Sequence, residues 1–297
     1  MRRLSVLLLA VVHVLLLEAS DQRPPVDFSA EPTFRVATFN IHKGANRPGL
    51  YDLEQTIDLI QYLDADLVGV QEALRNHAGF KCDDQPALIA DGLRRRTGRP
   101  WTYVYAQSWV TEDRRCIERG NGDDVETEGL AFFTPGRIID SSWVRLSKGR
   151  VGLAVRTASM PDIPVIVTHL AATRQNHAAR EKELETLLPW AARLGPGILL
   201  GDLNARPDAN ELVSVLAQYR DAWADAVKRG DARGVLSGST RPGRRVSRID
   251  YVLYAPNVNL TLESVEIVDP STLPNLGGVS DHFPVVATFR AARPAAR

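Results

Sequence analysis

Hydrophobic positions along the chain predict a mixture of strands and helices. Residues 34–40 (FRVATFN) largely alternate apolar and polar side chains, as in a half-buried strand, and residues 66–71 (DLVGVQ) form a short buried strand. Residues 52–63 between them predict a helix, because apolar side chains recur there every three or four positions.

The later part of the chain predicts more strands than helices. Strands are expected at residues 101–106, 130–133, 138–146, 151–158, 165–168, 197–200, 249–254, 260–268 and 283–289. One helix is expected to carry Leu184, Leu187, Leu188, Ala191 and Leu194 on one face, and two short helical segments follow at 209–217 and 221–228. Apart from one strand, residues 75–128 read as loops. This mixture indicates sheets covered by helices.

The N-terminus has a different pattern. A short basic start is followed by an almost wholly apolar run over residues 4–17 and then by small residues, which is typical of a secretory signal and short for a membrane-spanning helix. We expect residues 1–20 to be a signal peptide or, alternatively, an uncleaved membrane anchor. Residues 21–33 would be a linker and residues 34–292 one domain. The protein would be periplasmic or extracellular.

Charge and cysteine content narrow the picture further. Lys plus Arg and Asp plus Glu are equal at 36 each, so the chain lacks the basic excess typical of tight, unspecific nucleic-acid binding. The two cysteines, Cys82 and Cys116, predict one disulfide in an exported protein. No feature indicates an obligate protein partner.

Polar groups suited to phosphate chemistry recur at the ends of the predicted strands. They are Asn40, Glu72, His169, Asp202, Asn204, Asp250, Asp281 and His282. Each alone is typical of a turn, a helix cap or a solvated carboxylate. Since strand ends along one edge of a sheet meet at a common rim, the set together predicts a functional site.

The ordered motifs TFN (38–40), QE (71–72), THL (168–170), GDLN (201–204), RIDYV (248–252) and SDHFPV (280–285) identify a resemblance. The chain resembles the endonuclease/exonuclease/phosphatase, or deoxyribonuclease I-like, superfamily over about residues 34–290. NIHKG (40–44) is similar to a bacterial branch of metal-dependent hydrolases. The resemblance implies a four-layer α/β sandwich, in which two mixed, mostly antiparallel sheets pack face to face beneath helices.

The resemblance also implies roles for the residues at the strand ends. Asn40, Glu72 and Asp281 would hold Mg²⁺, with Mn²⁺ as an alternative, because hard oxygen ligands suit these ions. His282, held by Asp250, would contact the phosphate or activate water, and Asp202 would position or deprotonate the attacking water. Asn204 would bind the phosphate. His169 would be an acid for the leaving oxygen, although the sequence assigns it no carboxylate partner.

The substrate is the least determined part of the prediction. We expect a metal-dependent hydrolase of phosphodiesters, acting on nucleic acid or a phospholipid headgroup. The alternatives are a phosphomonoesterase and a non-catalytic binding module of the same fold. Arg244, Arg245 and Arg248 are candidates for binding the substrate phosphate, because guanidinium groups pair well with phosphate; a solvated loop is the other interpretation.

Overall fold

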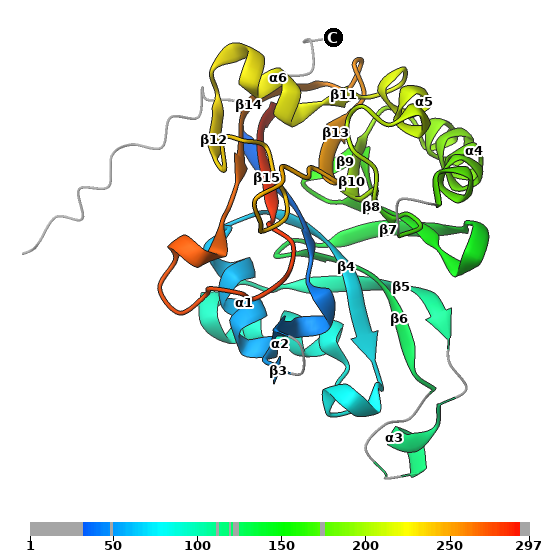
Figure 1. Ribbon diagram of the computed structural model, residues 1–297, viewed down its shortest axis with the longest axis vertical. Helices are drawn as coiled ribbons and strands as arrows, with labels where there is room; N and C mark the ends of the chain where they lie inside the picture. Colours follow the sequence, from blue (N-terminus) through cyan, green and yellow to red (C-terminus); the bar gives the residue numbers. More distant parts are fainter. Residues whose placement is uncertain are drawn as a thin grey trace, which may run out of the picture. The chain divides into compact units, whose positions relative to one another are not determined.

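Two mixed β-sheets pack face to face in the computed structural model of the chain (Figure 1). The structure describes residues 32–47, 50–110, 113–118, 120, 125–172 and 176–291, which belong to one compact unit beginning at Pro32. The predicted signal or anchor, and all but the end of the predicted linker, lie outside the described residues. Among the helices described, none is long and apolar enough to cross a membrane.

The larger sheet has seven strands and the smaller has six. In spatial order the larger contains β12 (Ala232–Gly234), β14 (Leu260–Ile267), β15 (Val285–Ala291), β1 (Thr33–Asn40), β4 (Leu67–Arg75), β6 (Thr127–Thr134) and β5 (Thr102–Val110). The smaller contains β11 (Arg220–Asp221), β13 (Asp250–Tyr254), β10 (Ile198–Asp202), β9 (Met160–His169), β8 (Val151–Thr157) and β7 (Ile138–Arg145). A separate ribbon pairs β2 (Ala45–Arg47) with β3 (Leu50–Tyr51).

Helices cover the outer faces of the sheets (Figure 1). The covering helices are α1 (Leu53–Tyr62), α2 (Gln85–Thr97), α4 (His177–Leu194), α5 (Val213–Leu216) and α6 (Ala222–Arg229). The short helix α3 (Arg115–Glu118) lies between β5 and β6 in the chain, beyond the ends of these strands (Figure 1). Ile57 of α1 and Leu93 of α2 join a core cluster with Val68 of the larger sheet. Leu187 of α4 lies over Gly152 of β8 in the smaller sheet. The predicted four-layer sandwich is therefore confirmed.

The prediction that residues 75–128 are mostly loops is wrong. This region contains the 13-residue helix α2, which was not predicted, whereas the strand expected at residues 101–106 is present as β5. Local chemistry explains the helix: the Asp84 side chain accepts from the Ala87 N–H at its start, and Gly98 ends it with φ +67°, a conformation that glycine adopts without steric cost. Its charged outer face masked the apolar spacing of Ile89 and Leu93.

Gly69 allows the two sheets to approach closely beneath the site. A Cβ atom at this position in β4 would lie 2.9 Å from Val167 Cγ2 and 3.1 Å from Leu200 Cδ1, both in the opposite sheet. The residues around it are fully buried, so the neighbouring side chains have little room to move. This glycine therefore belongs to the packing of the core.

A disulfide joins Cys82 to Cys116, which confirms the predicted pairing. The two half-cystines are separated by 34 positions, and the segment between them includes α2 and β5. The bridge ties the short helix α3 back to the segment before α2.

We expect the double replacement Cys82→Ser with Cys116→Ser to lower the free energy of unfolding by about 4 kcal/mol. A cross-link closing a loop of this length removes roughly that much entropy from the unfolded chain. Urea denaturation of the oxidised wild type and the double variant would measure the difference. Adding reductant should bring the wild type to the variant's midpoint; an unchanged midpoint would contradict the proposed contribution.

Candidate active site

Three strands of the smaller sheet bring three polar side chains into one row. Asp202 ends β10, where it pairs with His169 on the parallel strand β9 and with Asp250 on the antiparallel strand β13. Paired residues on adjacent strands point to the same face of a sheet. All three side chains are buried, so the predicted gathering of these strand ends is observed.

The larger sheet contributes Asn40 and Glu72 from its adjacent strands β1 and β4. Asn40 pairs with Gln71, and Glu72 follows at a bulge where the register between β4 and β6 shifts. Glu72 has φ +59°, an uncommon conformation for a residue with a side chain. Asn40 Nδ2 donates to Glu72 Oε1 at 3.1 Å and to Asp202 Oδ2 at 3.2 Å. The amide of Asn40 thus connects carboxylates from the two sheets.

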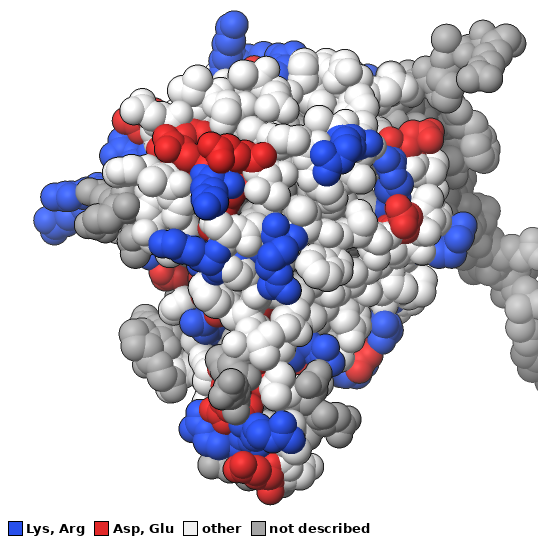
Figure 2. All heavy atoms as spheres, turned by 90° about the vertical axis from the view of Figure 1, so that its right-hand side faces the viewer, with Lys and Arg blue, Asp and Glu red and all other residues white. Residues whose placement is uncertain are grey.

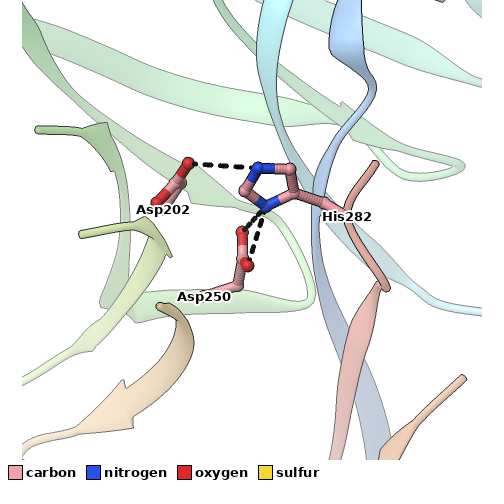
Figure 3. Close-up of side chains that lie close together, drawn as sticks. All are labelled: Asp202, Asp250 and His282. Atoms are coloured by element: carbon pink, nitrogen blue, oxygen red, sulfur yellow. Dashed lines mark hydrogen bonds and ion pairs between the residues drawn. The ribbon is translucent and has the colours of Figure 1, made fainter. Parts of the chain in front are cut away.

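The segment before β15 places His282 beside this row. Ser280 Oγ donates to the Asn40 carbonyl at 2.8 Å and accepts from the His282 N–H at 3.1 Å. His282 Nδ1 then faces both oxygens of Asp250, at 3.0 and 2.9 Å, while its Nε2 lies 3.8 Å from Asp202 Oδ2 (Figure 3). The Asp250 carboxylate therefore fixes Nδ1 and turns Nε2 towards Asp202.

The two acids and His282 shift one another's protonation. Burial and the nearby negative charge of Asp250 raise the pKa of the Asp202 carboxyl above its ordinary value. Burial disfavours the charged form of His282, but Asp250, with Asp202 and Asp281 nearby, raises its pKa above the ordinary histidine value. His282 is accordingly an imidazolium held between carboxylates at neutral pH.

His169 is in the opposite electrostatic state. Its Nδ1 lies 3.0 Å from the Arg150 guanidinium, which can only donate, so Nδ1 accepts and Nε2 carries the proton. That Nε2 lies 3.5 Å from Asp202 Oδ2. Burial and the positive charge of Arg150 lower the pKa of His169 well below its usual value. His169 is therefore a neutral N–H donor at this site.

Three charged residues near the centre were missed from the sequence. Arg150 lies beside His169 and stacks over Trp109 at 5.3 Å from the ring centroid. Glu128 of β6 is paired with Lys43 at 3.6 Å, and burial together with the charge of Glu72 raises its pKa. No local pattern marks Arg150 or Glu128, because their partners lie far away in the sequence.

The remaining predicted residues lie at the rim or beyond it. Asp281 Oδ1 is 3.9 Å from His282 Nε2, and the Asp281 side chain also pairs with Arg241. Asn204 donates from its backbone to Asp202 Oδ1 at 2.8 Å and from its side chain to the Leu170 carbonyl.

The three candidate phosphate-binding arginines are not gathered at this centre. Arg244 and Arg245 are exposed. Arg248 pairs with Asp221 at 2.6 Å and lies over the Tyr251 ring. In the same loop, Arg241 contacts Asp281 at the rim of the centre, and a role of Arg244, Arg245 or Arg248 in phosphate binding stays a prediction.

The donor set fits a divalent cation. Asp202, Asp250 and His282 offer ligand atoms that all lie within 4.8 Å of one another. Both oxygens of Asp250 already face His282, so we place the cation on the Glu72–Asp202 side, where two carboxylates converge on Asn40. Hard oxygen ligands suit Mg²⁺, and a cation there would offset the repulsion that raises the pKa of Asp202.

Comparison with known proteins supports the same grouping of motifs. A model of the Endonuclease/Exonuclease/phosphatase family matches residues 37–282, most of the chain. A search of curated proteins finds no match.

Solved structures share the fold at low sequence identity. An endonuclease/exonuclease/phosphatase from Beutenbergia cavernae is 22% identical over 89% of this chain and 73% of its own, with a TM-score of 0.66. The human Nocturnin catalytic domain is 20% identical over 88% and 96%, with a TM-score of 0.61. A mannosyl-6-phosphatase from Bacteroides thetaiotaomicron is 16% identical over 86% and 99%, with a TM-score of 0.62.

Replacing Arg150 with Met should raise the pKa of His169, because it removes the adjacent positive charge while keeping an unbranched chain against Trp109. Nitrogen NMR of the histidine rings would follow the change: the wild type should show proton-free Nδ1 and protonated Nε2. The matched control is Arg145→Met, since Arg145 donates to the Ser108 carbonyl and lies over a different tryptophan. Equal His169 titration in both variants would contradict the assigned role of Arg150.

Proposed function

The chain belongs to the endonuclease/exonuclease/phosphatase family, and we propose that it is an exported, divalent-metal-dependent phosphoesterase that hydrolyses a phosphodiester with an activated water. Members of the family are phosphoester hydrolases and generally depend on a divalent metal. The observation that carries the proposal is the buried arrangement of Asp202 between His169 and His282, beside Glu72 and Asn40.

Asp202 is the group best placed to act on water. Its Oδ1 is held by the Asn204 backbone, which leaves Oδ2 directed towards both imidazoles and the Asn40 amide. A water bound between the two imidazoles and the cation would therefore lie within reach of a carboxylate oxygen that can accept its proton. Asp202 would take the proton of the attacking water.

The two histidines would bind the phosphate in different ways. His282, charged and fixed by Asp250, presents Nε2 as a charge-assisted donor to a phosphate oxygen. His169, neutral and fixed by Arg150, presents Nε2–H as a donor without taking up a proton first. Donors fixed in advance at the point where charge develops supply much of the stabilisation of a transition state.

Glu72 and Asp202 would hold the cation, and Asp281 stays a predicted further ligand at the rim. Asn40, which the sequence predicts as a ligand, directs its Nδ2 at both carboxylates, so in this orientation it would position them and not bind the ion itself. A Mg²⁺ ion bound there would neutralise charge on the phosphate oxygens. Asn40 Oδ1 accepts from the His42 backbone N–H at 3.0 Å, which sets the orientation of the amide relative to the two carboxylates.

A phosphodiester substrate remains the first choice, and a phosphomonoester is the second. The surface charge argues against a broad nucleic-acid track: Lys and Arg are interspersed with Asp and Glu on the face in Figure 2, and the whole chain has no net charge. The mannosyl-6-phosphatase among similar structures supports the monoester alternative. Either reaction would use the same polar centre.

Export is supported by two features of different kinds. The apolar run near the N-terminus is typical of a secretory signal, and the Cys82–Cys116 disulfide suits an oxidising compartment. Cell fractionation of the full chain, with a mass measured without reduction, should place a bridged protein outside the cytoplasm. Recovery only in the cytoplasm with two free thiols would contradict export.

We expect Asp202→Asn and His282→Gln each to lower kcat/KM for bis(p-nitrophenyl) phosphate in Mg²⁺ by at least about 1,000-fold. General acid–base groups contribute about 100- to 10,000-fold, and these residues also position the phosphate. The matched control is Asp231→Asn, an exposed carboxylate paired with Arg229, which should keep the wild-type rate.

Chelation with EDTA should abolish the activity and added Mg²⁺ or Mn²⁺ should restore it. Calorimetry should show that Glu72→Gln weakens Mg²⁺ binding in the absence of substrate, because it removes a charged oxygen ligand. Turnover that persists in EDTA or in both catalytic variants would exclude the mechanism. A complete lack of turnover with diester and monoester substrates would favour the non-catalytic binding module.

A further inference from the structure

A polar pocket opens directly beside the catalytic centre. It has a volume of about 570 Å³, within the range of roughly 300–1,000 Å³ found for small-ligand sites. Asn204, which holds Asp202 through its backbone, and Arg241, which pairs with Asp281, both line it. A group attached to a phosphate at the centre could therefore extend into this space, here called the side pocket.

The side pocket has a buried polar wall. Arg180 of α4 and Glu211 are both buried, with Arg180 Nε 2.8 Å and a terminal nitrogen 2.6 Å from Glu211 Oε1. Arg180 also donates to the Ala171 carbonyl at 3.0 Å. Burying an ion pair has a larger desolvation free-energy cost than burying apolar residues of the same size. The pair therefore contributes little net stability, and stability alone does not account for it. Its rigid donors and acceptors suit the wall of a polar binding site.

The charges around the side pocket are already balanced. Arg180 is matched by Glu211, Arg241 by Asp281, and Arg206 by Asp208 at 3.5 Å. A second phosphate would have to compete with these carboxylates for the guanidinium groups. A ligand without further charge would leave all three of these ion pairs intact.

The lining offers hydrogen-bond donors and acceptors together. Arg206 and Asn210 donate, and Asp208 and the Asn210 amide oxygen accept. Hydroxyl groups both donate and accept, so they can form hydrogen bonds with both kinds of lining side chain. An alkyl chain would displace water from these side chains without replacing the hydrogen bonds that water made. Sites built to bind hydroxyls consequently discriminate strongly against analogues that lack them.

We propose that the side pocket binds an uncharged, hydroxyl-rich group, such as a sugar ring or a polyol, esterified to the phosphate held at the catalytic centre. This inference rests on the proposed function for the position of the phosphate. It narrows the substrate to a phosphoester of a polyhydroxylated alcohol. It also makes Arg206 and Asn210 determinants of specificity outside the catalytic machinery.

Calorimetric binding of non-cleavable phosphonates in Mg²⁺ tests the proposal without requiring turnover. The probes are the methylene phosphonate analogues of glucose 6-phosphate and of glycerol 3-phosphate, n-heptylphosphonate as a chain without hydroxyls, and inorganic phosphate. At least one hydroxylated probe should bind about tenfold or more tightly than both heptylphosphonate and phosphate. Whether the glucose or the glycerol probe binds more tightly then distinguishes a sugar ring from a glycerol headgroup.

Variants of the side pocket locate the binding. Arg206→Ala and Asn210→Ala should each lower the affinity for the preferred hydroxylated probe by about tenfold, because one or two hydrogen bonds are lost. The affinity for inorganic phosphate should stay unchanged. The matched controls, Arg233→Ala and Gln218→Ala, replace exposed side chains that do not line the side pocket and should change neither affinity.

Several results would overturn the proposal. One is that heptylphosphonate binds as tightly as the hydroxylated probes, or more tightly. Another is that the pocket variants lose affinity for inorganic phosphate as much as for the hydroxylated probe. The third is that no hydroxylated probe binds. Hydrolysis of bis(p-nitrophenyl) phosphate is measured separately. A protein that cleaves this diester but fails the binding test keeps its proposed function, and one that binds the hydroxylated probe but cleaves nothing loses the proposed function alone.

Discussion

The register of three neighbouring strands is the constraint on which the site depends. His169, Asp202 and Asp250 face one another because β9, β10 and β13 pair with these residues in one row. A shift of one residue would turn Asp202 to the opposite face of the sheet and bury an apolar neighbour in its place. The interior-facing residues of the same strands, including Val167, Leu200 and Val252, are fully or almost fully buried, so packing of the core fixes the register. The polar side chains are thereby positioned by hydrophobic burial two residues away on the same strands.

The two imidazoles show how a second partner sets the role of a side chain. Both present Nε2 to Asp202 Oδ2, at 3.5 and 3.8 Å. The Asp250 carboxylate contacts Nδ1 of His282 and favours the protonated, charged ring. The Arg150 guanidinium contacts Nδ1 of His169 and disfavours protonation of that ring. One charged donor and one neutral donor therefore flank a single carboxylate. This division avoids two adjacent positive charges, which would repel each other in a buried site.

Much of the fold and of the centre could be predicted from the sequence, because both depend on patterns that are local. Apolar strands that end in Asn40 or Asp202, or that follow His282, are visible as short runs, and their order identifies the family motifs. Helix α2 was missed because the charged residues of its outer face obscure the helical spacing of its apolar residues in the sequence. Arg150 could not be found, since its role arises from a contact with His169 across a strand pair, and nothing in the neighbouring sequence shows that this arginine is buried.

The distribution of charge around the centre indicates where a cation would be bound most favourably. Asp250 is compensated by His282, Asp281 by Arg241, and Glu128 by Lys43. Glu72 and Asp202 are instead joined through the neutral amide of Asn40, and burial makes the negative charge of Asp202 costly. Because ligands that bind only the folded state stabilise it, a divalent ion at this point would contribute to folding as well as to catalysis. The burial that makes the charge of Asp202 costly in the unliganded chain would thus favour binding of such an ion.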